Sequence, residues 1–287
     1  MGGSVTPVFI VGCGRSGTQA LARMFDSIEN TTMYHEYMIH HVQPLGVRYF
    51  HGAASREEVA KTVQRLHGAA IRFSDTPVWG DCSNKLSWFI DVLAEEFPSA
   101  RFIHLVRDGR KVASSLFHKL GHECLDDISS RKMREWLDNP VLETMPPPEK
   151  KYWWPLAHDN DAEHSAYAGF DHFERIAFHW AQINREIARQ LDALEQGQWM
   201  RVRLEDITRD KNLLEKVGQF AGCAIGPEQV DLMVKPHNVI KPVNYQLSEE
   251  QTEFFWKVAG DQMELFGYQN EAVYELSYDN APERKER

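Results

Sequence analysis

Short apolar runs alternate with amphipathic stretches along the chain. The run Val8–Val11 is wholly apolar, and Arg101–Val106 and Trp199–Leu204 are also rich in apolar residues, so each predicts a buried strand. Residues 32–37 predict a second strand or an extended loop. Helical spacing of apolar residues predicts helices over residues 18–27, 56–66, 87–97, 173–194, 213–220 and 251–266. Strands that alternate with helices indicate an α/β fold, with a central parallel sheet flanked by helices on both faces.

Residues from about 120 to 170 interrupt this alternation. They contain Pro140, the run Pro146-Pro147-Pro148 and the aromatic stretch Tyr152-Trp153-Trp154-Pro155. Irregular insertions of this kind either cover a substrate pocket or form a packed lid without substrate contact. We interpret the segment as a substrate-covering insertion within a single domain that spans residues 1–287.

Length and composition fit one enzyme domain. The 287 residues are 43% hydrophobic, which suffices for a full α/β core, and no apolar run is long enough to cross a bilayer. The opening Met-Gly-Gly-Ser-Val-Thr-Pro lacks the charged and apolar regions of a secretion signal, so we expect a cytoplasmic protein that does not bind membranes. Reduced thiols are favoured over a disulfide framework because four scattered cysteines lack C-x-x-C spacing: Cys13, Cys82, Cys124 and Cys223.

The chain is acidic, with a formal net charge of −10. Long-range repulsion opposes encounter with nucleic acid or with a heavily anionic polysaccharide, so neither is expected as a partner. A neutral or cationic acceptor is favoured instead. The charge leaves room for an anionic cofactor, because a few Arg, Lys and backbone donors can form a positive pocket inside an acidic protein.

The junction between Val8 and Gln19 is the most specific feature of the chain. Val-Phe-Ile-Val leads into the glycine-rich turn Gly-Cys-Gly-Arg-Ser-Gly-Thr-Gln, and a turn that opens a helix binds anions through backbone N–H groups and the helix dipole. Its glycines satisfy G-x-G-x-x-G and the first half of G-x-x-x-x-G-K-[ST]. Thr18 and Gln19 replace the Lys and the Mg²⁺-binding hydroxyl of the second motif, so a metal-dependent ATPase or kinase is not expected. A Rossmann site is an alternative, because Glu36 lies 24 residues after Gly12, near the position of a ribose-binding acid.

Three segments carry a further resemblance. Gly-x-x-Arg-Ser-Gly-Thr follows the first predicted strand, Arg107 and Ser115 follow the strand 101–106 at a spacing that lets both converge on one phosphate, and residues 239–244 are Val-Ile-Lys-Pro-Val-Asn. The first two resemble the phosphosulfate loop and the 3′-phosphate site of sulfotransferases that use 3′-phosphoadenosine 5′-phosphosulfate. The third resembles the cofactor-covering loop of the tyrosylprotein sulfotransferase branch. The resemblance implies a three-layer P-loop-like fold and a set of cofactor-binding residues: Gly14, Arg15, Ser16, Gly17, Thr18, Gln19, Arg107, Ser115, Lys119, Lys241 and Asn244.

Candidate catalytic residues follow from the chemistry of sulfuryl transfer. This is an in-line displacement in which an acceptor O–H or N–H loses its proton and adenosine 3′,5′-bisphosphate leaves, and it resembles phosphoryl transfer without the metal. Alignment on the loop puts His35-Glu36 where tyrosylprotein sulfotransferases carry their catalytic glutamate, so Glu36 is the predicted base and His35 the alternative. Arg15 and the N–H groups at the start of the first helix are expected to stabilise charge on the sulfuryl and bridging oxygens.

Three positions depart from the family pattern. Many relatives have a Lys after the Asp of Asp81-Cys82, and Lys85 is the candidate substitute for that charge. Leu204 stands where relatives often have a Tyr, and Lys119 replaces an Arg near the 3′-phosphate, which keeps the charge but loses the guanidinium fork. No metal is expected, because neither His35, Glu36, His40 and His41 nor the His/Asp stretch 158–164 fits a zinc or EF-hand pattern.

The sequence therefore predicts a sulfotransferase that moves a sulfuryl group to a hydroxyl or nitrogen of a small molecule. The absence of a recognisable anchor or signal and the aromatic insertion favour a small metabolite over a peptide tyrosine, which is the acceptor of the tyrosylprotein branch. Two further alternatives are a Rossmann NAD(P)-binding oxidoreductase and a non-catalytic nucleotide-binding module that has lost its chemistry.

Overall fold

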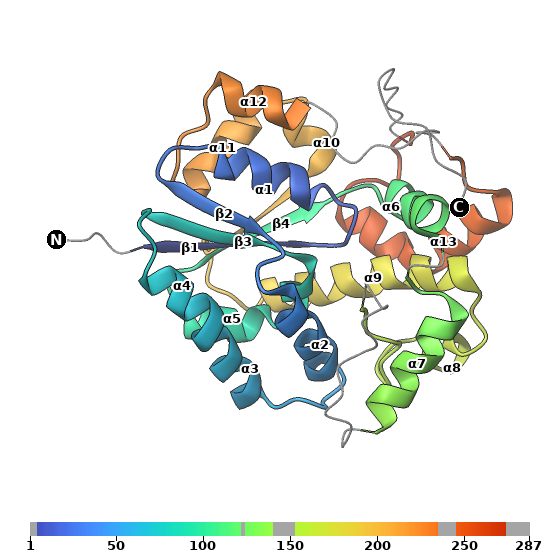
Figure 1. The fold of residues 1–287 in the computed structure, drawn as a ribbon. Coiled ribbons are helices and arrows are strands. Elements are labelled where there is room, and N and C mark those ends of the chain that lie inside the picture. Colours follow the sequence, from blue (N-terminus) through green and yellow to red (C-terminus); the bar gives the residue numbers. More distant parts are fainter. Residues whose placement is uncertain (1–4, 122–123, 140–152, 235–244, 274–287) are drawn as a thin grey trace.

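A five-stranded parallel sheet forms the centre of the computed structural model, which describes residues 5–121, 124–139, 153–234 and 245–273. The strand order within these residues is β2-β3-β1-β4-β5, and all four neighbouring pairs are parallel (Figure 1). The strands are β1 (Thr6–Gly12), β2 (Thr31–His35), β3 (Val78–Cys82), β4 (Arg101–Val106) and β5 (Trp199–Arg203). The predicted α/β fold with a central parallel sheet is confirmed.

Helices cover both faces of the sheet (Figure 1). One face carries α1 (Thr18–Asp26), α10 (Leu204–Ile207), α11 (Lys211–Ala221) and α12 (Pro227–Val234). The other carries α2 (Ile39–Phe50), α3 (Arg56–Val63), the π-helix η1 (Gln64–Gly68), α4 (Ala69–Arg72), the 3₁₀-helix η2 (Asn84–Trp88), α5 (Ile90–Glu96) and α9 (His172–Leu191). The remaining helices are α6 (Gly109–Ser115), the π-helix η3 (Leu116–Leu120), α7 (Asp127–Asp138), α8 (His164–Tyr167) and α13 (Glu249–Leu265).

The central strand β1 explains why the sheet needs two helical layers. Phe9 and Val11 pack into the core shared with α3, α5 and α9, whereas Val8 and Ile10 pack into the core shared with α1 and α11. Successive side chains of a strand point to opposite faces, so a run that is apolar at every position is stable only when both faces are covered. The unbroken run Val8–Val11 is therefore the sequence signature of this three-layer arrangement.

The strand order excludes the Rossmann alternative. In the Rossmann order the second strand lies beside the first, but here β3 lies between β1 and β2. Gly80 makes this placement possible, because a Cβ there would lie 2.7 Å from the carbonyl oxygen of Val8 and 2.7 Å from the sulfur of Met33. Glu36, the predicted ribose-binding acid of that alternative, consequently follows an edge strand that does not pair with β1.

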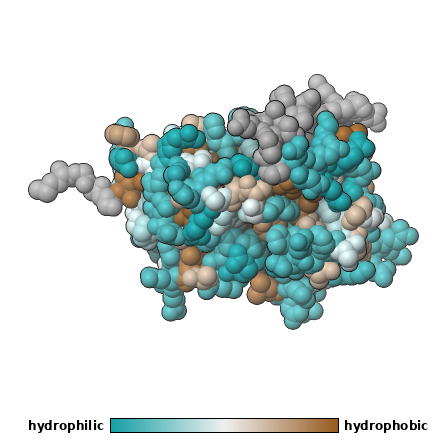
Figure 2. All heavy atoms as spheres, turned by 90° about the horizontal axis from the view of Figure 1, so that it is seen from below, coloured by the Kyte–Doolittle hydropathy of each residue, from teal (hydrophilic) through white to brown (hydrophobic). Residues whose placement is uncertain are grey.

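The surface is mainly hydrophilic. In the view of Figure 2, hydrophobic residues form only small, separated patches on the face that is turned to the reader. No helix within the described ranges is long and apolar enough to span a bilayer. The four cysteines all lie in described residues and form no disulfide.

Candidate active site

The loop between β1 and α1 is shaped to expose backbone donors. Ser16 turns back on the loop, with its N–H and its hydroxyl both donating to the carbonyl of Cys13 at 3.2 and 2.6 Å. Gly17, the N-cap of α1, has φ 99°, and a Cβ there would lie 2.8 Å from a methyl carbon of Leu204. Gly17 provides no side-chain cap, so α1 begins as a helix start that favours anions, at the place where the phosphosulfate loop is predicted.

Arg15, Arg107, Lys119 and the Ser115 hydroxyl come together beside this loop, and we call them the cation cluster. Arg107 Nη1 donates to the carbonyl of Arg15 at 2.9 Å, and Arg15 Nε donates to Ser115 Oγ at 3.1 Å. Burial, together with the positive charges of Arg15, Arg107 and Lys111, lowers the pKa of Lys119 to about 8. The cluster thus concentrates like charges whose mutual repulsion an anion would relieve.

Four parts of the chain contribute to the cation cluster, and Arg15 comes from the loop between β1 and α1. Arg107 follows the last residue of β4, Ser115 ends α6, and Lys119 lies in η3. Arg107 and Ser115 are linked through Arg15, whose carbonyl accepts from Arg107 and whose side chain donates to Ser115. That Arg107 and Ser115 converge on one phosphate stays a prediction.

Glu36 lies in a tightly held connection after β2. Its φ of 59° is in the left-handed region, its N–H donates to the carbonyl of Cys82 at 3.3 Å, and the N–H of Tyr37 donates to Asp81 Oδ1 at 3.1 Å. His35, the alternative base, has its Nε2 3.3 Å from the hydroxyl of Thr18 at the start of α1. The structure therefore places both base candidates at the carboxyl end of the sheet, with His35 in contact with the predicted phosphosulfate loop.

Cys82 and Lys85, the predicted substitute for a lysine at position 82, have different surroundings. Cys82 is fully buried, its thiol donates to the carbonyl of Thr18 at 3.1 Å, and burial raises its pKa well above the usual value. Lys85 is 5% exposed and its Nζ donates to the carbonyl of Trp153 at 3.1 Å. Burial lowers the pKa of Lys85, and the Glu36 carboxylate opposes that shift, so the two charges lie within electrostatic reach of each other.

Lys85 is also near the phosphosulfate loop. Burial raises the pKa of the Cys13 thiol to about 12, and the positive charge of Lys85 opposes this rise. On its other side, Lys85 adds to the effect of burial in lowering the pKa of His179 to about 3. The chain therefore holds a buried ammonium between the loop, Glu36 and α9, and sequence reasoning gave no sign of the His179 contact because it depends on how α9 packs.

Residues 153–157 of the insertion pack over this ammonium. Trp153 and Trp154 are 4% and 3% exposed. The backbone N–H of Leu156 donates to His51 Nε2 at 3.0 Å, and Gln182 donates to the carbonyl of Leu156 at 2.9 Å. The bond from Leu156 needs a lone pair on His51, and burial keeps that ring neutral by lowering its pKa to about 4. This part of the insertion is a fixed wall of the site.

The predicted cofactor-covering loop and the His/Asp stretch add no described residue to this site. Lys241 and Asn244, together with the rest of the predicted cofactor-covering loop, lie outside the described residues. Within the described residues no three His, Cys, Asp or Glu side chains gather as a metal site would require. Asp161, in the His/Asp stretch, instead accepts hydrogen bonds from the N–H of His158 and the side chains of Gln182 and Arg185, so it stabilises the local backbone.

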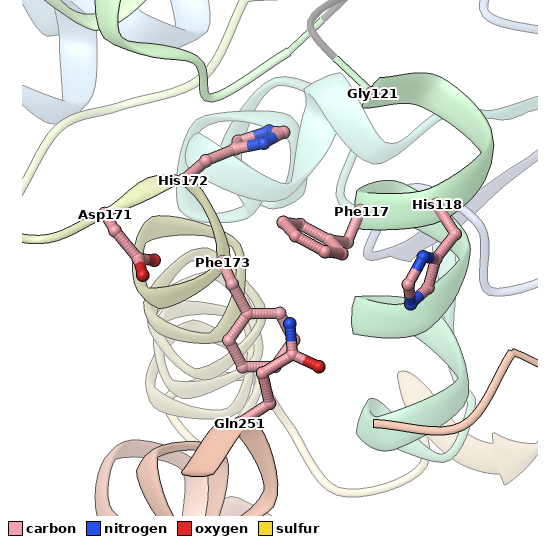
Figure 3. Close-up of a pocket in the computed structure, with 7 residues that line it drawn as sticks. All are labelled: Phe117, His118, Gly121, Asp171, His172, Phe173 and Gln251. Atoms are coloured by element: carbon pink, nitrogen blue, oxygen red, sulfur yellow. The ribbon is translucent and has the colours of Figure 1, made fainter. Parts of the chain in front are cut away.

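A separate hollow lies where η3 meets the starts of α9 and α13. Its volume is about 510 Å³, and its lining includes none of the cation cluster. Figure 3 shows Phe117 from η3 next to Phe173 from α9, with their rings edge to face at 5.6 Å between centroids, and Gln251 from α13 beside them. The lining residues are Phe117, His118, Gly121, Asp171, His172, Phe173 and Gln251.

Comparison with known proteins finds a family match over the first half of the chain. Residues 7–141, which include the loop, Glu36, Lys85 and the cation cluster, match the model of the Sulfotransferase family. This match confirms the resemblance to sulfotransferases that the motifs indicated, and it supports sulfotransferase activity. No protein with a curated description matches the chain significantly.

Several solved sulfotransferases are similar over most of the chain. One from Alicyclobacillus acidocaldarius is 14% identical, with 91% of this chain and 95% of that chain covered and a TM-score of 0.48. Mouse sulfotransferase SULT7A1 complexed with PAP is 11% identical, with 90% and 84% covered and a TM-score of 0.49. STF9 from Mycobacterium avium is 10% identical, with 92% and 78% covered and a TM-score of 0.48.

Proposed function

We propose that this protein transfers a sulfuryl group from 3′-phosphoadenosine 5′-phosphosulfate to a hydroxyl or nitrogen of a small molecule. The observation that carries the proposal is the presence of two adjoining anion sites, the uncapped start of α1 and the cation cluster, in a chain that matches the Sulfotransferase family. A donor with phosphate groups at both ends of its ribose needs two such sites, whereas a nucleotide with phosphate only at its 5′ end needs one.

The residues of the two sites fit the two ends of this donor. The N–H groups of Gly17, Thr18 and Gln19 would hold the 5′ end, because a helix start favours negative charge. Arg107 and Ser115 would hold the 3′-phosphate, with the guanidinium supplying a charged fork and the hydroxyl a single donor. Lys119 would add a positive charge there, and its proximity to other cations favours an anion at that place.

Glu36 and Lys85 are the groups that we assign to the chemical step. The bound donor supplies an electrophilic sulfuryl group with adenosine 3′,5′-bisphosphate as its leaving group. Glu36 would take the proton from the acceptor, and its half-buried position at the end of β2 leaves it accessible. Lys85 would hold negative charge near the sulfuryl oxygens, since it lies in electrostatic reach of both Glu36 and the loop.

The packing of the insertion supports a small acceptor. The carbonyl of buried Trp153 accepts a hydrogen bond from the Lys85 ammonium, which is itself 5% exposed, so the approach to this ammonium is restricted. The net charge of −10 favours a neutral or cationic acceptor over an anionic one. A peptide tyrosine, as in the tyrosylprotein branch, is the alternative acceptor that the same cofactor residues would serve.

Ligand-dependent stability provides the first test. Adenosine 3′,5′-bisphosphate at about 100 times its Kd is expected to raise the Tm by about 5 °C, because it binds the folded state alone. Adenosine 5′-monophosphate serves as the matched ligand without the 3′-phosphate and should stabilise less at equal concentration. Equal stabilisation by both nucleotides would remove the second anion site from the proposal.

Transfer of label tests the activity itself. With ³⁵S-labelled donor, we expect label to move to small phenols, alcohols or amines in a panel that also contains tyrosine peptides. Transfer to peptides alone would reassign the acceptor to the tyrosylprotein class. Binding of the bisphosphate without transfer to any acceptor would favour a nucleotide-binding module that has lost its chemistry.

A further inference from the structure

We propose that Asp81 and His67 form a positioning pair that holds Glu36 in place to accept the proton. This inference rests on the proposed function, because it assigns to Glu36 the role of base. Neither residue belongs to the loop or to the cation cluster. Both lie beneath the connection from β2 to α2, on the side of the sheet that faces α2 and α3.

Asp81 uses its two carboxylate oxygens for two different partners. Oδ1 accepts the backbone N–H of Tyr37 at 3.1 Å, and Oδ2 is 3.1 Å from His67 Nε2. The Asp81 and His67 side chains are both 0% exposed. A carboxylate removed from water needs such partners, so its position is determined by them. The pair therefore fixes the peptide bond that directly follows Glu36.

The backbone that Asp81 holds is strained. Glu36 and Met38, on either side of Tyr37, have φ values of 59° and 52°, a region that side chains other than glycine seldom adopt. Residues in such conformations persist when the surrounding structure over-determines them. Here the constraints are two hydrogen bonds at adjacent peptides, Glu36 N–H to the carbonyl of Cys82 and Tyr37 N–H to Asp81. The second is the only one of these two that depends on a side chain.

A π-helical turn positions His67 beside Asp81. His67 lies in the π-helix η1, and its ring contacts Phe9, Tyr37 and Trp79 at centroid distances of 6.0, 5.4 and 5.9 Å. Its Nδ1 has no hydrogen-bond partner among the described residues. Asp81 is thus the polar contact that orients this ring. π-Helical turns often occur at functional sites, where the extra residue re-aims a side chain.

A double-mutant cycle tests the pair. Asp81→Ala removes the acceptor for Tyr37 N–H and is expected to slow single-turnover transfer about 10- to 100-fold, because a displaced base loses its alignment. Calorimetric affinity for adenosine 3′,5′-bisphosphate should change less than twofold. In a Glu36→Gln background the same substitution should slow transfer less than twofold further, since the base that Asp81 positions is already absent.

Conservative variants separate positioning from general folding. Asp81→Asn keeps an acceptor for Tyr37 N–H and a polar contact to His67, so it should recover transfer to within about fivefold of wild type. Cys82→Ala is the matched control, because its side chain contacts α1 from the neighbouring position of β3. If Cys82→Ala slows transfer, it should do so by the same factor in wild type and in the Glu36→Gln background.

Hydrogen exchange gives a readout that does not depend on activity. The amide of Tyr37 should exchange at least tenfold faster in Asp81→Ala than in wild type, with unchanged exchange in β1 and β4. If Asp81→Ala does not fold, His67→Ala offers the same cycle with an expected three- to tenfold loss of transfer.

Two results would overturn the positioning role. One is that Asp81→Ala slows transfer by the same factor in the Glu36→Gln background as in wild type. The other is that Asp81→Ala weakens bisphosphate affinity and leaves the rate of transfer unchanged. Near wild-type transfer by Glu36→Gln alone would be a different failure, because it would remove the base from the proposed function.

Discussion

The two ends of the candidate site are stabilised in opposite ways. At the end of β4, like charges gather, and Arg15, Arg107 and Lys111 lower the pKa of Lys119. At the ends of β2 and β3, complementary groups meet, because Lys85 lies in electrostatic reach of Glu36 and His67 Nε2 lies 3.1 Å from Asp81 Oδ2. A negatively charged ligand would stabilise the first region most, because it would offset the repulsion between the cations. In the second region, Lys85 and Asp81 already have partners within the protein.

This difference indicates how binding and chemistry are divided. A region where like charges gather contributes to affinity for an anion, and its effect depends on the protonation of its members. A region of buried, mutually oriented groups contributes through geometry, so its variants should alter turnover with little effect on affinity. The following substitutions test whether the two regions are separable.

The largest effect is expected at Glu36. Glu36→Gln keeps the shape of the side chain but cannot accept the proton, so turnover should fall by about 10²- to 10⁴-fold while affinity for the bisphosphate stays within about twofold. Single-turnover transfer and calorimetry measure the two quantities. His35→Ala is the control, because a loss confined to that variant would move the base back by one residue.

Arg107 should show the reverse pattern. Arg107→Ala removes a charge-assisted hydrogen bond and is expected to weaken bisphosphate binding by about 1.5–3 kcal/mol, which is about 10- to 150-fold. Adenosine 5′-monophosphate should bind equally well to wild type and variant. Lys216→Ala, which removes one exposed positive charge on α11, controls for the change in net charge. Equal losses for both nucleotides would show that Arg107 acts through the fold.

Lys119 should make donor binding depend on pH. Its pKa is about 8 in the ligand-free protein, and a bound phosphate must raise it, because the charged form is the one that binds. Affinity should therefore be constant well below pH 8 and fall as pH rises through 8, by at most about tenfold per pH unit. Calorimetry at several pH values between 6.5 and 9.5 measures this slope. Lys119→Arg should flatten the profile, and a slope unchanged in that variant would contradict the assignment.

The smallest effect is expected at Ser115. Ser115→Ala removes one neutral donor and should weaken bisphosphate binding by about 0.5–1.5 kcal/mol. Ser114→Ala is the matched control, because the hydroxyl of this adjacent serine donates instead to the carbonyl of Tyr245 at 2.7 Å. A larger loss in Ser114→Ala than in Ser115→Ala would indicate that the helix end matters more than the hydroxyl beside Arg15.

The elements that the sequence predicted well are those with a strong local pattern. The strand Arg101–Val106 has the predicted bounds, and α1 and α13 end within a few residues of expectation. The placement of Arg107 and Ser115 after β4 was also predictable, because both belong to one strand–helix junction. Local pattern is sufficient in these cases since the residues that matter are close in sequence.

The elements that were not predicted depend on contacts distant in sequence. β3, Val-Trp-Gly-Asp-Cys, contains a glycine and an acid, and its fit beside β1 depends on Gly80 leaving room for Met33. α2 contains Pro44, which locally opposes a helix, and it is retained by the burial of its apolar face. The Asp81–His67 pair was hidden for the same reason, since it joins an unpredicted strand to a π-helical turn.

The alternation of side chains along β3 limits what can be engineered into this site. Asp81 supports the connection that carries Glu36, while the next side chain, Cys82, points to the opposite layer and supports α1. Restoring the lysine that many relatives carry at position 82 would place an ammonium under the first turn of α1, against the positive end of that helix dipole. Designs that aim at this site should therefore leave Cys82 unchanged and place any added charge elsewhere than under α1.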